Sequence, residues 1–209
     1  MATLGMTLFH STGSPFVRKV MLVLHETGQL EQVALHGVQL SPINPSAALN
    51  AGNPAGKLPA LGLADGSVLH DSRVICDYLD QQHGSTPLIP RDGPSRWQRL
   101  TLASLADALM DAAVLIRYET FLRPADKRWD DWVQAQQGKI DRGLAQLEHE
   151  AASAPHGPFD IAAIGIVCLL GYLDFRQPQL GWRTRCPQLA DWYAAVQERP
   201  SVQATQPSA

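Results

Sequence analysis

The chain has 209 residues, of which 45% are hydrophobic and 18% charged, an ordinary composition for a globular protein with one large domain or two small ones. Its formal net charge of -3 gives no support for nucleic acid as a partner. The three cysteines (Cys76, Cys168 and Cys186) are widely spaced and odd in number, which argues against a disulfide framework or a metal knuckle. We expect them to be buried structural thiols.

The N-terminal stretch MATLGMTLFH lacks the apolar core of a signal peptide, and no apolar run is long enough to span a bilayer. The seven histidines show no HExxH or other metal-ligand spacing, so no metal is expected. The cysteine usage fits a reducing compartment. Together these features predict a cytoplasmic protein with no membrane partner.

A strand is predicted over residues 6–10, followed by turn residues and a helix. Pro15 suits the first turn of that helix, with Ser14 as its N-cap, and Gly28 ends it. A second strand is predicted over residues 32–38. A strand-helix-strand unit of this size implies a right-handed crossover and a parallel pair.

Residues 41–56 are rich in proline, asparagine and serine, so we predict a loop with at most a short helix. The sequence from Gly52 to Leu58 superficially resembles that of a phosphate-binding loop. Its spacing is one residue short, and no serine or threonine follows Lys57. Nucleotide binding there is rejected.

The stretch 53–72, NPAGKLPALGLADGSVLHDS, predicts a strand, a tight Asp65-Gly66 turn, a second strand and a helix start at Asp71-Ser72. Pro59 is unusual so early in an apolar strand, and indicates an edge or a special backbone turn. An edge strand beside a helix N-terminus can capture an extended, anionic, peptide-like ligand.

The proline-marked segment 83–92 is the predicted domain boundary, and everything after it is predicted to be helical. The run 161–173 carries no charge and is too short for a membrane, so it predicts a buried central helix. The five tryptophans are expected in the helical core. Three apolar stripes predict further packed helices: Leu102, Leu105, Leu109, Ala112, Ile116; Trp129, Trp132, Val133, Ile140, Leu144, Leu147; and Leu189, Trp192, Tyr193, Val196.

The sequence G-K-L-P-A-L followed by D-G-S-V-L-H-D-S resembles the glutathione-binding half-site of the soluble bacterial glutathione transferases. The phrases GYLDFR and LADWYAAVQERPSV resemble the C-terminal domain of that family. The resemblance implies an α/β thioredoxin-like N-terminal domain followed by an all-α helical-bundle C-terminal domain. The expected domains are residues 1–83 and 93–209, joined by a linker over residues 84–92.

The resemblance also implies a set of glutathione-binding residues. In the family the proline is cis, so the Leu58–Pro59 bond is expected to be cis, with the Leu58 backbone pairing with the cysteinyl unit of glutathione. Asp71 and Ser72 would hold the γ-glutamyl end. Lys57 would contact the glycyl carboxylate or remain a solvated loop lysine.

Ser14-Pro15-Phe16 is the expected site of thiol chemistry. Ser14 as a helix cap is the simpler interpretation, and the functional one is that its hydroxyl also stabilises the thiolate of glutathione. Ser11 is the alternative catalytic serine, Thr12 offers a third hydroxyl, and Ser14 is preferred. Phe16 joins the expected glutathione-binding residues. Serine at this position, where related proteins carry cysteine, disfavours mixed-disulfide chemistry.

The resemblance therefore implies a serine-type glutathione transferase acting in detoxification as a homodimer. Glutathione would be the co-substrate, conjugated to, or reducing, a small hydrophobic electrophile held near Leu105, Met110 or Tyr118. The alternative is a non-catalytic transferase-like binding module, similar to bacterial stringent-starvation-type proteins that contact RNA polymerase. Such proteins tend to lack the serine hydroxyl or the acid-Ser pair, and both are present here.

One departure from the family concerns the start of the central helix. Family members carry Ser or Thr three residues ahead of an Asp, whereas here Gly157-Pro158-Phe159 precedes Asp160. Either Gly157 acts as a weaker cap or Asp160 caps the helix itself. An altered helix start is expected in both cases.

Overall fold

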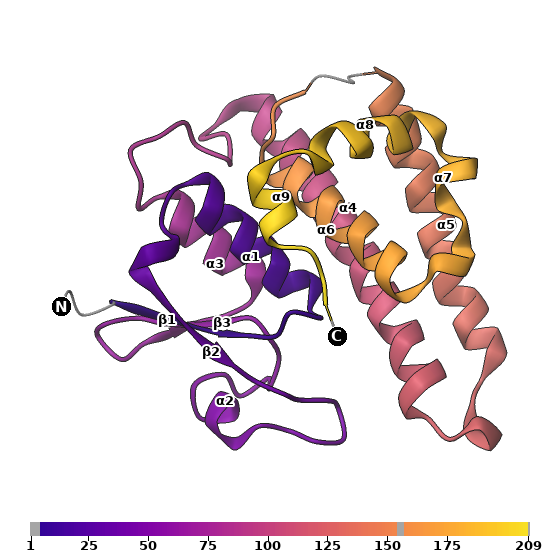
Figure 1. The fold of residues 1–209 in the computed structure, drawn as a ribbon, viewed down its shortest axis with the longest axis horizontal. Helices are drawn as coiled ribbons and strands as arrows, with labels where there is room; N and C mark the ends of the chain where they lie inside the picture. Colours follow the sequence, from indigo (N-terminus) through magenta and orange to yellow (C-terminus); the bar gives the residue numbers. More distant parts are fainter. Residues whose placement is uncertain (1–4, 154–156, 209) are drawn as a thin grey trace. The chain divides into compact units, whose positions relative to one another are not determined.

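The computed structural model describes residues 5–153 and 157–208 (Figure 1). By internal contacts the chain forms two compact units, one of Met1–Arg91 with Ala204–Ala209 and the other of Asp92–Gln203. The C-terminal residues join the first unit through two side-chain contacts. Arg18 Nε lies 3.4 Å from Thr205 Oγ1, and Thr12 Oγ1 donates to the Ser208 carbonyl at 3.3 Å.

The first unit is built on a mixed sheet of four strands, β1 (Met6–His10), β2 (Val33–Gly37), β3 (Ala60–Gly62) and β4 (Val68–Leu69). Their order is β2-β1-β3-β4, with β1 and β2 parallel and the other two pairs antiparallel (Figure 1). The parallel pair and the hairpin predicted from the sequence are both confirmed. Gly66 adopts φ 86° in the hairpin turn, a conformation that glycine allows.

Three helices complete the first unit, α1 (Pro15–Glu26), α2 (Ala47–Gly52) and α3 (Ser72–Asp80). Figure 1 shows α1 and α3 side by side over one face of the sheet. The core between them is apolar because α1 and α3 each turn their buried residues inward (Val20 and Leu24, Ile75 and Leu79, with Leu8 and Leu61 from the sheet). The short α2 confirms a mostly irregular segment between β2 and β3.

The segment after α3 is ordered by one carboxylate. Asp80 is 1% exposed and accepts hydrogen bonds from the backbone N–H groups of Leu88 at 2.6 Å and Ile89 at 3.1 Å. His83 Nε2 lies 3.1 Å from the same carboxylate. A buried charge with these partners is satisfied, so residues 81–91 have a defined path without helix or strand.

The second unit is helical, with α4 (Gly93–Arg117), α5 (Asp130–Ser153), α6 (Ile161–Arg176), α7 (Trp182–Arg185), α8 (Pro187–Gln197) and the start of α9 (Pro200–Ala204). Short turns are Leu30–Gln32 in the first unit and Ala125–Lys127 and Pro178–Leu180 in the second, while Tyr118–Leu122 is a π-helical turn. The sheet followed by helices confirms the fold class expected from the sequence.

The centre of the second unit is α6, whose residues 161–173 are all buried, as predicted for a charge-free central helix. Gly165 lets α6 approach α4 closely, since a Cβ there would lie 3.3 Å from that of Ala106. Asp160 is the N-cap of α6, accepting from the N–H groups of Ala162 and Ala163. This is one of the two starts expected for the helix.

The prediction that the tryptophans form the helical core is wrong for two of them. Trp97 is 67% exposed and Trp129 is 63% exposed, whereas Trp182 is 2% exposed. Trp97 lies in the first turns of α4, and Trp129 precedes α5, so both are at helix ends. A periodic stripe identifies the face of a helix that is apolar, and it does not tell how far along that face the neighbouring helix extends.

Among the described residues, no single helix is long and apolar enough to cross a membrane. Taken together, α6 and the segment Pro178–Arg185 have sufficient length and apolar composition, but a bend of 98° separates them.

Candidate functional site

The chain leaves β1 through a tight turn that places Ser14 at the start of α1. The Ser14 N–H donates to the Ser11 carbonyl at 3.1 Å, and Ser14 Oγ accepts from the Val17 N–H at 3.3 Å. Pro15 occupies the first helical position. Ser14 is therefore a helix N-cap. A hydroxyl can accept and donate at once, and no acceptor for this O–H is found among the described residues, so its proton is available to a ligand.

The two other hydroxyls of the turn differ from Ser14. Ser11 is half-buried, and its side chain has no hydrogen bond within the described part of the chain. Thr12 is exposed and donates to the Ser208 carbonyl. Ser11 and Ser14 thus both remain free to donate, whereas the Thr12 proton is engaged.

The segment before β3 is held in place by a buried asparagine. Asn53 is 1% exposed, its Nδ2 donates to the Lys57 carbonyl at 2.8 Å and its Oδ1 accepts from the Ala55 N–H at 3.0 Å. These bonds set the path of the chain into Leu58 and Pro59, while the Lys57 side chain stays exposed. The role of Asn53 was not recognised in the sequence, where the only signal was an Asn-Pro turn dipeptide.

The Leu58–Pro59 peptide bond is cis, as expected. Leu58 is half-buried and directly precedes the buried Pro59 and β3. A second cis bond joins His70 and Asp71, between β4 and α3.

Asp71 is the N-cap of α3 and Ser72 is the first residue of that helix. Asp71 accepts from the Arg73 N–H at 2.9 Å, and Arg73 Nη2 donates to its second oxygen at 2.8 Å. The hydrogen bonds and charge of Arg73 lower the pKa of Asp71, against a smaller opposing effect of burial. Ser72 is 3% exposed. The sequence indicated the two capping candidates, and it did not indicate Arg73 as the partner of the acid.

The sheet brings these three segments to one end. Phe9 of β1 pairs antiparallel with Ala60 of β3, so the residues that follow β1 lie beside those that precede β3. Leu69 of β4 pairs with Leu61, which places the start of α3 at the same end. Two helix N-termini and an irregular backbone segment thus face one region, an arrangement suited to an extended ligand carrying negative charge.

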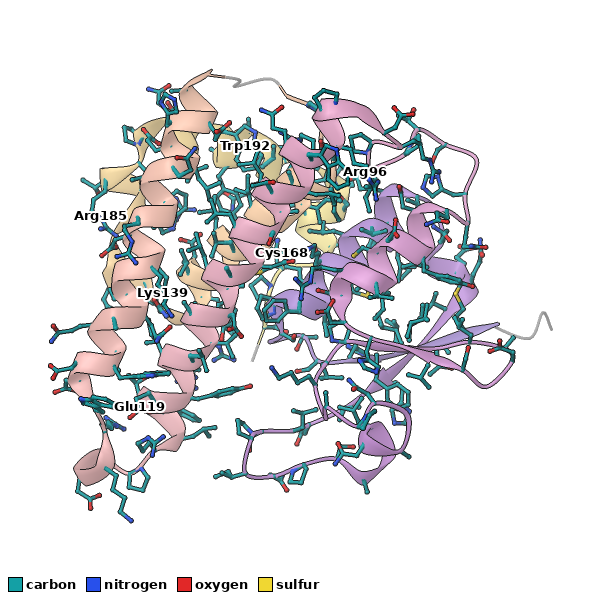
Figure 2. All side chains as sticks on the ribbon, turned by 180° about the vertical axis from the view of Figure 1, so that it is seen from behind. Arg96, Glu119, Lys139, Cys168, Arg185 and Trp192 are labelled. Atoms are coloured by element: carbon teal, nitrogen blue, oxygen red, sulfur yellow. The ribbon has the colours of Figure 1, made fainter. Side chains whose placement is uncertain are left out.

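The positions expected near an electrophile lie on α4 and the turn after it. Met110 is fully buried, while Leu105 and Tyr118 are half-buried and retain accessible surface. Glu119 follows Tyr118 at the end of the helix (Figure 2). It accepts from Arg123 Nε at 2.7 Å and from the Trp129 N–H at 2.9 Å, and so holds the connection from α4 to α5. Across residues 5–153 and 157–208, no group of three or more His, Cys, Asp or Glu could hold a metal ion.

Comparison with known proteins gives the family. Residues 8–87 match the family model of the glutathione S-transferase N-terminal domain, and residues 130–195 match that of the C-terminal domain. The uncharacterized GST-like protein YibF of Escherichia coli is 31% identical over 204 residues, covering 97% of this chain and 98% of that protein.

Solved structures of glutathione transferase family members are also similar to this chain. A glutathione transferase family member from Pseudomonas fluorescens, crystallised with bound glutathione, is 60% identical, covers 98% of this chain and 100% of its own, and superposes with a TM-score of 0.96. A further structure from that organism, with bound S-(propanoic acid)-glutathione, is 58% identical, with coverage of 97% and 100% and a TM-score of 0.91. The chain belongs to the glutathione S-transferase family.

Proposed function

We propose that this protein is a glutathione transferase that binds glutathione at the sheet end described above and transfers its thiolate to, or uses it to reduce, a hydrophobic electrophile. The observation that carries the proposal is the convergence of the Ser14 turn, the Leu58–Pro59 segment and the Asp71-Ser72 helix start. The presence of glutathione in a structure 60% identical to this chain supports it.

In the proposed complex each part of glutathione has a partner. The Leu58 backbone pairs with the cysteinyl unit, as free N–H and C=O groups beside a strand allow. The Ser72 N–H and hydroxyl, at the positive end of α3, bind the γ-glutamyl carboxylate. Asp71 accepts from the γ-glutamyl amine, and Lys57 binds the glycyl carboxylate. Phe16, half-buried in the first turn of α1, is the remaining residue of the proposed site.

The catalytic role falls to Ser14, with Ser11 as the alternative. A free thiol titrates near ~8.5, and lowering its pKa by about two units requires ~2.7 kcal/mol. A hydrogen bond to a charged group contributes ~1.5–3 kcal/mol, and a helix N-terminus adds ~0.3–1 kcal/mol. One serine hydroxyl at the start of α1 is therefore sufficient to form the thiolate without a general base.

Glutathione conjugation, rather than glutathione binding alone, is supported by the Pseudomonas fluorescens structure that contains S-(propanoic acid)-glutathione. We place the electrophile on the helical unit, near the accessible residues Leu105 and Tyr118. We also propose a role in cytoplasmic detoxification, as the resemblance to the family implies.

Calorimetric titration with glutathione tests the proposal, followed by conjugation of 1-chloro-2,4-dinitrobenzene. We expect saturable binding that Ser72→Ala weakens by roughly tenfold, as for loss of one hydrogen bond to a charged group. Ser104→Ala, at an exposed position of α4, is the matched control and should leave binding unchanged. Absence of glutathione binding by the wild-type protein would favour the non-catalytic binding module.

We propose that the protein is a homodimer. The exposed apolar side chains Val74 on α3 (49% exposed) and Trp97 on α4 (67% exposed) support an interface on these two helices. A twofold dimer makes such a contact self-complementary. Light scattering should give twice the chain mass of 22.8 kDa.

A further inference from the structure

The last residues of α4 and α6 bring two arginines together within the helical unit. The helices pack side by side along their length, from Gly165 against Ala106 to Gln177, whose Nε2 donates to the Ala113 carbonyl at 3.3 Å. Arg117 lies one turn beyond Ala113, and Arg176 directly precedes Gln177. The two guanidinium groups therefore lie at the same end of the helix pair.

The guanidinium carbon of each arginine lies over an aromatic ring. Arg117 Cζ lies 3.4 Å from the ring centroid of Phe121, in the π-helical turn that follows α4. Arg176 Cζ lies 3.9 Å from the ring centroid of Phe175. A cation placed over a ring is attracted by the negative face of that ring, which helps to hold the arginine side chain in place. Neither guanidinium group has a hydrogen-bond partner among the described residues, so its N–H groups are available to a planar acceptor such as a carboxylate.

Neither arginine has an acidic partner among the residues that the structure describes. Asp174 is engaged by Arg183 and by Trp182 Nε1, and Glu119 by Arg123 and the Trp129 N–H. Asp111 is exposed, and its charge raises the pKa of Tyr118 but is not among the charges that shift the pKa of Arg117. Two half-buried positive charges, close enough for Arg176 to lower the pKa of Arg117, therefore have no acidic partner among the described residues, and an anion would relieve their repulsion.

Two tyrosines flank the arginines. Burial raises the pKa of Tyr172 to about 12, with a smaller opposing effect of Arg176, so its phenol is protonated and neutral at physiological pH. Burial also raises the pKa of Tyr118. Burial, and the charge of Arg176, lower the pKa of Arg117, while Tyr172 has an opposing effect. The two arginines therefore lie close enough to repel each other.

We propose that Arg117 and Arg176 bind a carboxylate of the electrophile, so that this protein acts on aromatic or unsaturated electrophiles that carry an acidic group. The inference rests on the proposed transferase function and narrows its substrate class. With 4-chloro-3-nitrobenzoate, the glutathione sulfur forms a bond to the ring carbon that bears chlorine, and the carbon–chlorine bond breaks. Chloride leaves with the bonding electron pair, and the thiol proton passes to solvent.

The test compares 4-chloro-3-nitrobenzoate with 4-chloro-3-nitrobenzamide, which has the same shape without the charge. We expect Arg117→Gln and Arg176→Gln each to lower kcat/KM for the acid by roughly ten- to hundredfold, as for loss of a hydrogen-bonded ion pair, and to leave the amide nearly unchanged. Arg176→Lys keeps the charge but not the planar fork and should recover part of the activity. Arg142→Gln, at an exposed position of α5, removes the same charge and should change neither substrate.

A binding measurement separates this inference from the proposed function. Calorimetry with S-(2-carboxyethyl)glutathione and its amide, S-(2-carbamoylethyl)glutathione, should show tighter binding of the acid in the wild-type protein and no preference in Arg117→Gln. Free glutathione should bind both proteins equally, which also shows that the variant is folded. If the wild-type protein binds glutathione but binds the acid and the amide conjugate with equal affinity, this inference is overturned and the proposed function stands. Failure of the wild-type protein to bind glutathione overturns it together with the proposed function.

Discussion

Arg99 and Asp160 form a two-bond ion pair across the helical unit, with Arg99 Nε 2.5 Å and Nη2 2.7 Å from the two oxygens of the carboxylate. The same carboxylate accepts from the N–H groups of Ala162 at 2.9 Å and Ala163 at 3.2 Å. One side chain therefore caps α6 and ties it to α4. The serine or threonine that the resemblance implied three residues ahead of Asp160 is absent, and Asp160 itself caps α6.

Removal of either partner should destabilise the protein strongly. Asp160→Ala loses the cap and leaves Arg99 without its acid, so we expect the free energy of unfolding to fall by about 3–5 kcal/mol. Urea denaturation monitored by circular dichroism measures it. In a double-mutant cycle, Arg99→Met combined with Asp160→Ala should cost less than the sum of the single changes. Strict additivity would show that the two residues act independently.

Ser14→Ala should raise the pKa of the bound glutathione thiol by about one to two units, equivalent to ~1.4–2.7 kcal/mol, because the lost hydrogen bond is stronger to the thiolate than to the thiol. Glutathione affinity at acidic pH should change little. Loss of the N-cap should also lower stability by ~1 kcal/mol. Thiolate absorbance against pH is the measurement, with Ser11→Ala in parallel. A shift confined to Ser11→Ala would assign catalysis to that serine.

The pairing of Asp71 with Arg73 should be visible in the titration of the Asp71 carboxyl. The pKa of Asp71 lies below its ordinary value of 3.8, so the folded state binds the proton less readily than the unfolded one. The stability that this lowered pKa contributes is present above pH 3.8, and it is lost as the pH falls through the pKa that Asp71 has in the folded state. NMR titration of the Asp71 carboxyl should show an upward shift in Arg73→Gln. An unchanged value would mean that the ion pair is not populated in solution.

Activity should survive the loss of every cysteine. Cys76, Cys168 and Cys186 are buried and form no disulfide, and Figure 2 shows Cys168 in the middle of α6. Burial raises the pKa of Cys186, so its thiol is a poor nucleophile at neutral pH. A triple Cys→Ala variant should therefore conjugate glutathione at the wild-type rate per folded molecule. A folded but inactive variant would overturn the serine-type mechanism.

Trp97→Glu should dissociate the proposed dimer, because a charge within an apolar interface must be desolvated without a partner. Trp129→Glu is the matched control, since Trp129 is exposed to a similar extent on the same unit. Light scattering at micromolar concentration should give the monomer mass for Trp97→Glu and the dimer mass for the control. Equal masses for both variants would place the interface elsewhere.

Local sequence signals predicted most of the elements. The Ser14-Pro15 pair set the start of α1, the Asp65-Gly66 pair set the hairpin, and the charge-free run 161–173 predicted the buried α6. These features depend on backbone dihedral preferences and on apolar periodicity, which act over a few neighbouring residues. The glutathione motif could be located for the same reason, because its residues are close together in the chain.

The tertiary structure alone decided which side chains meet. Arg99 and Asp160 are far apart in the sequence, as are Arg117 and Arg176, and no local pattern joins them. The exposure of Trp97 and Trp129 likewise depends on where the neighbouring helices end. Charge pairing and burial are properties of three-dimensional proximity, so the ion pair that caps α6 and the uncompensated arginines became visible only once the helices were packed.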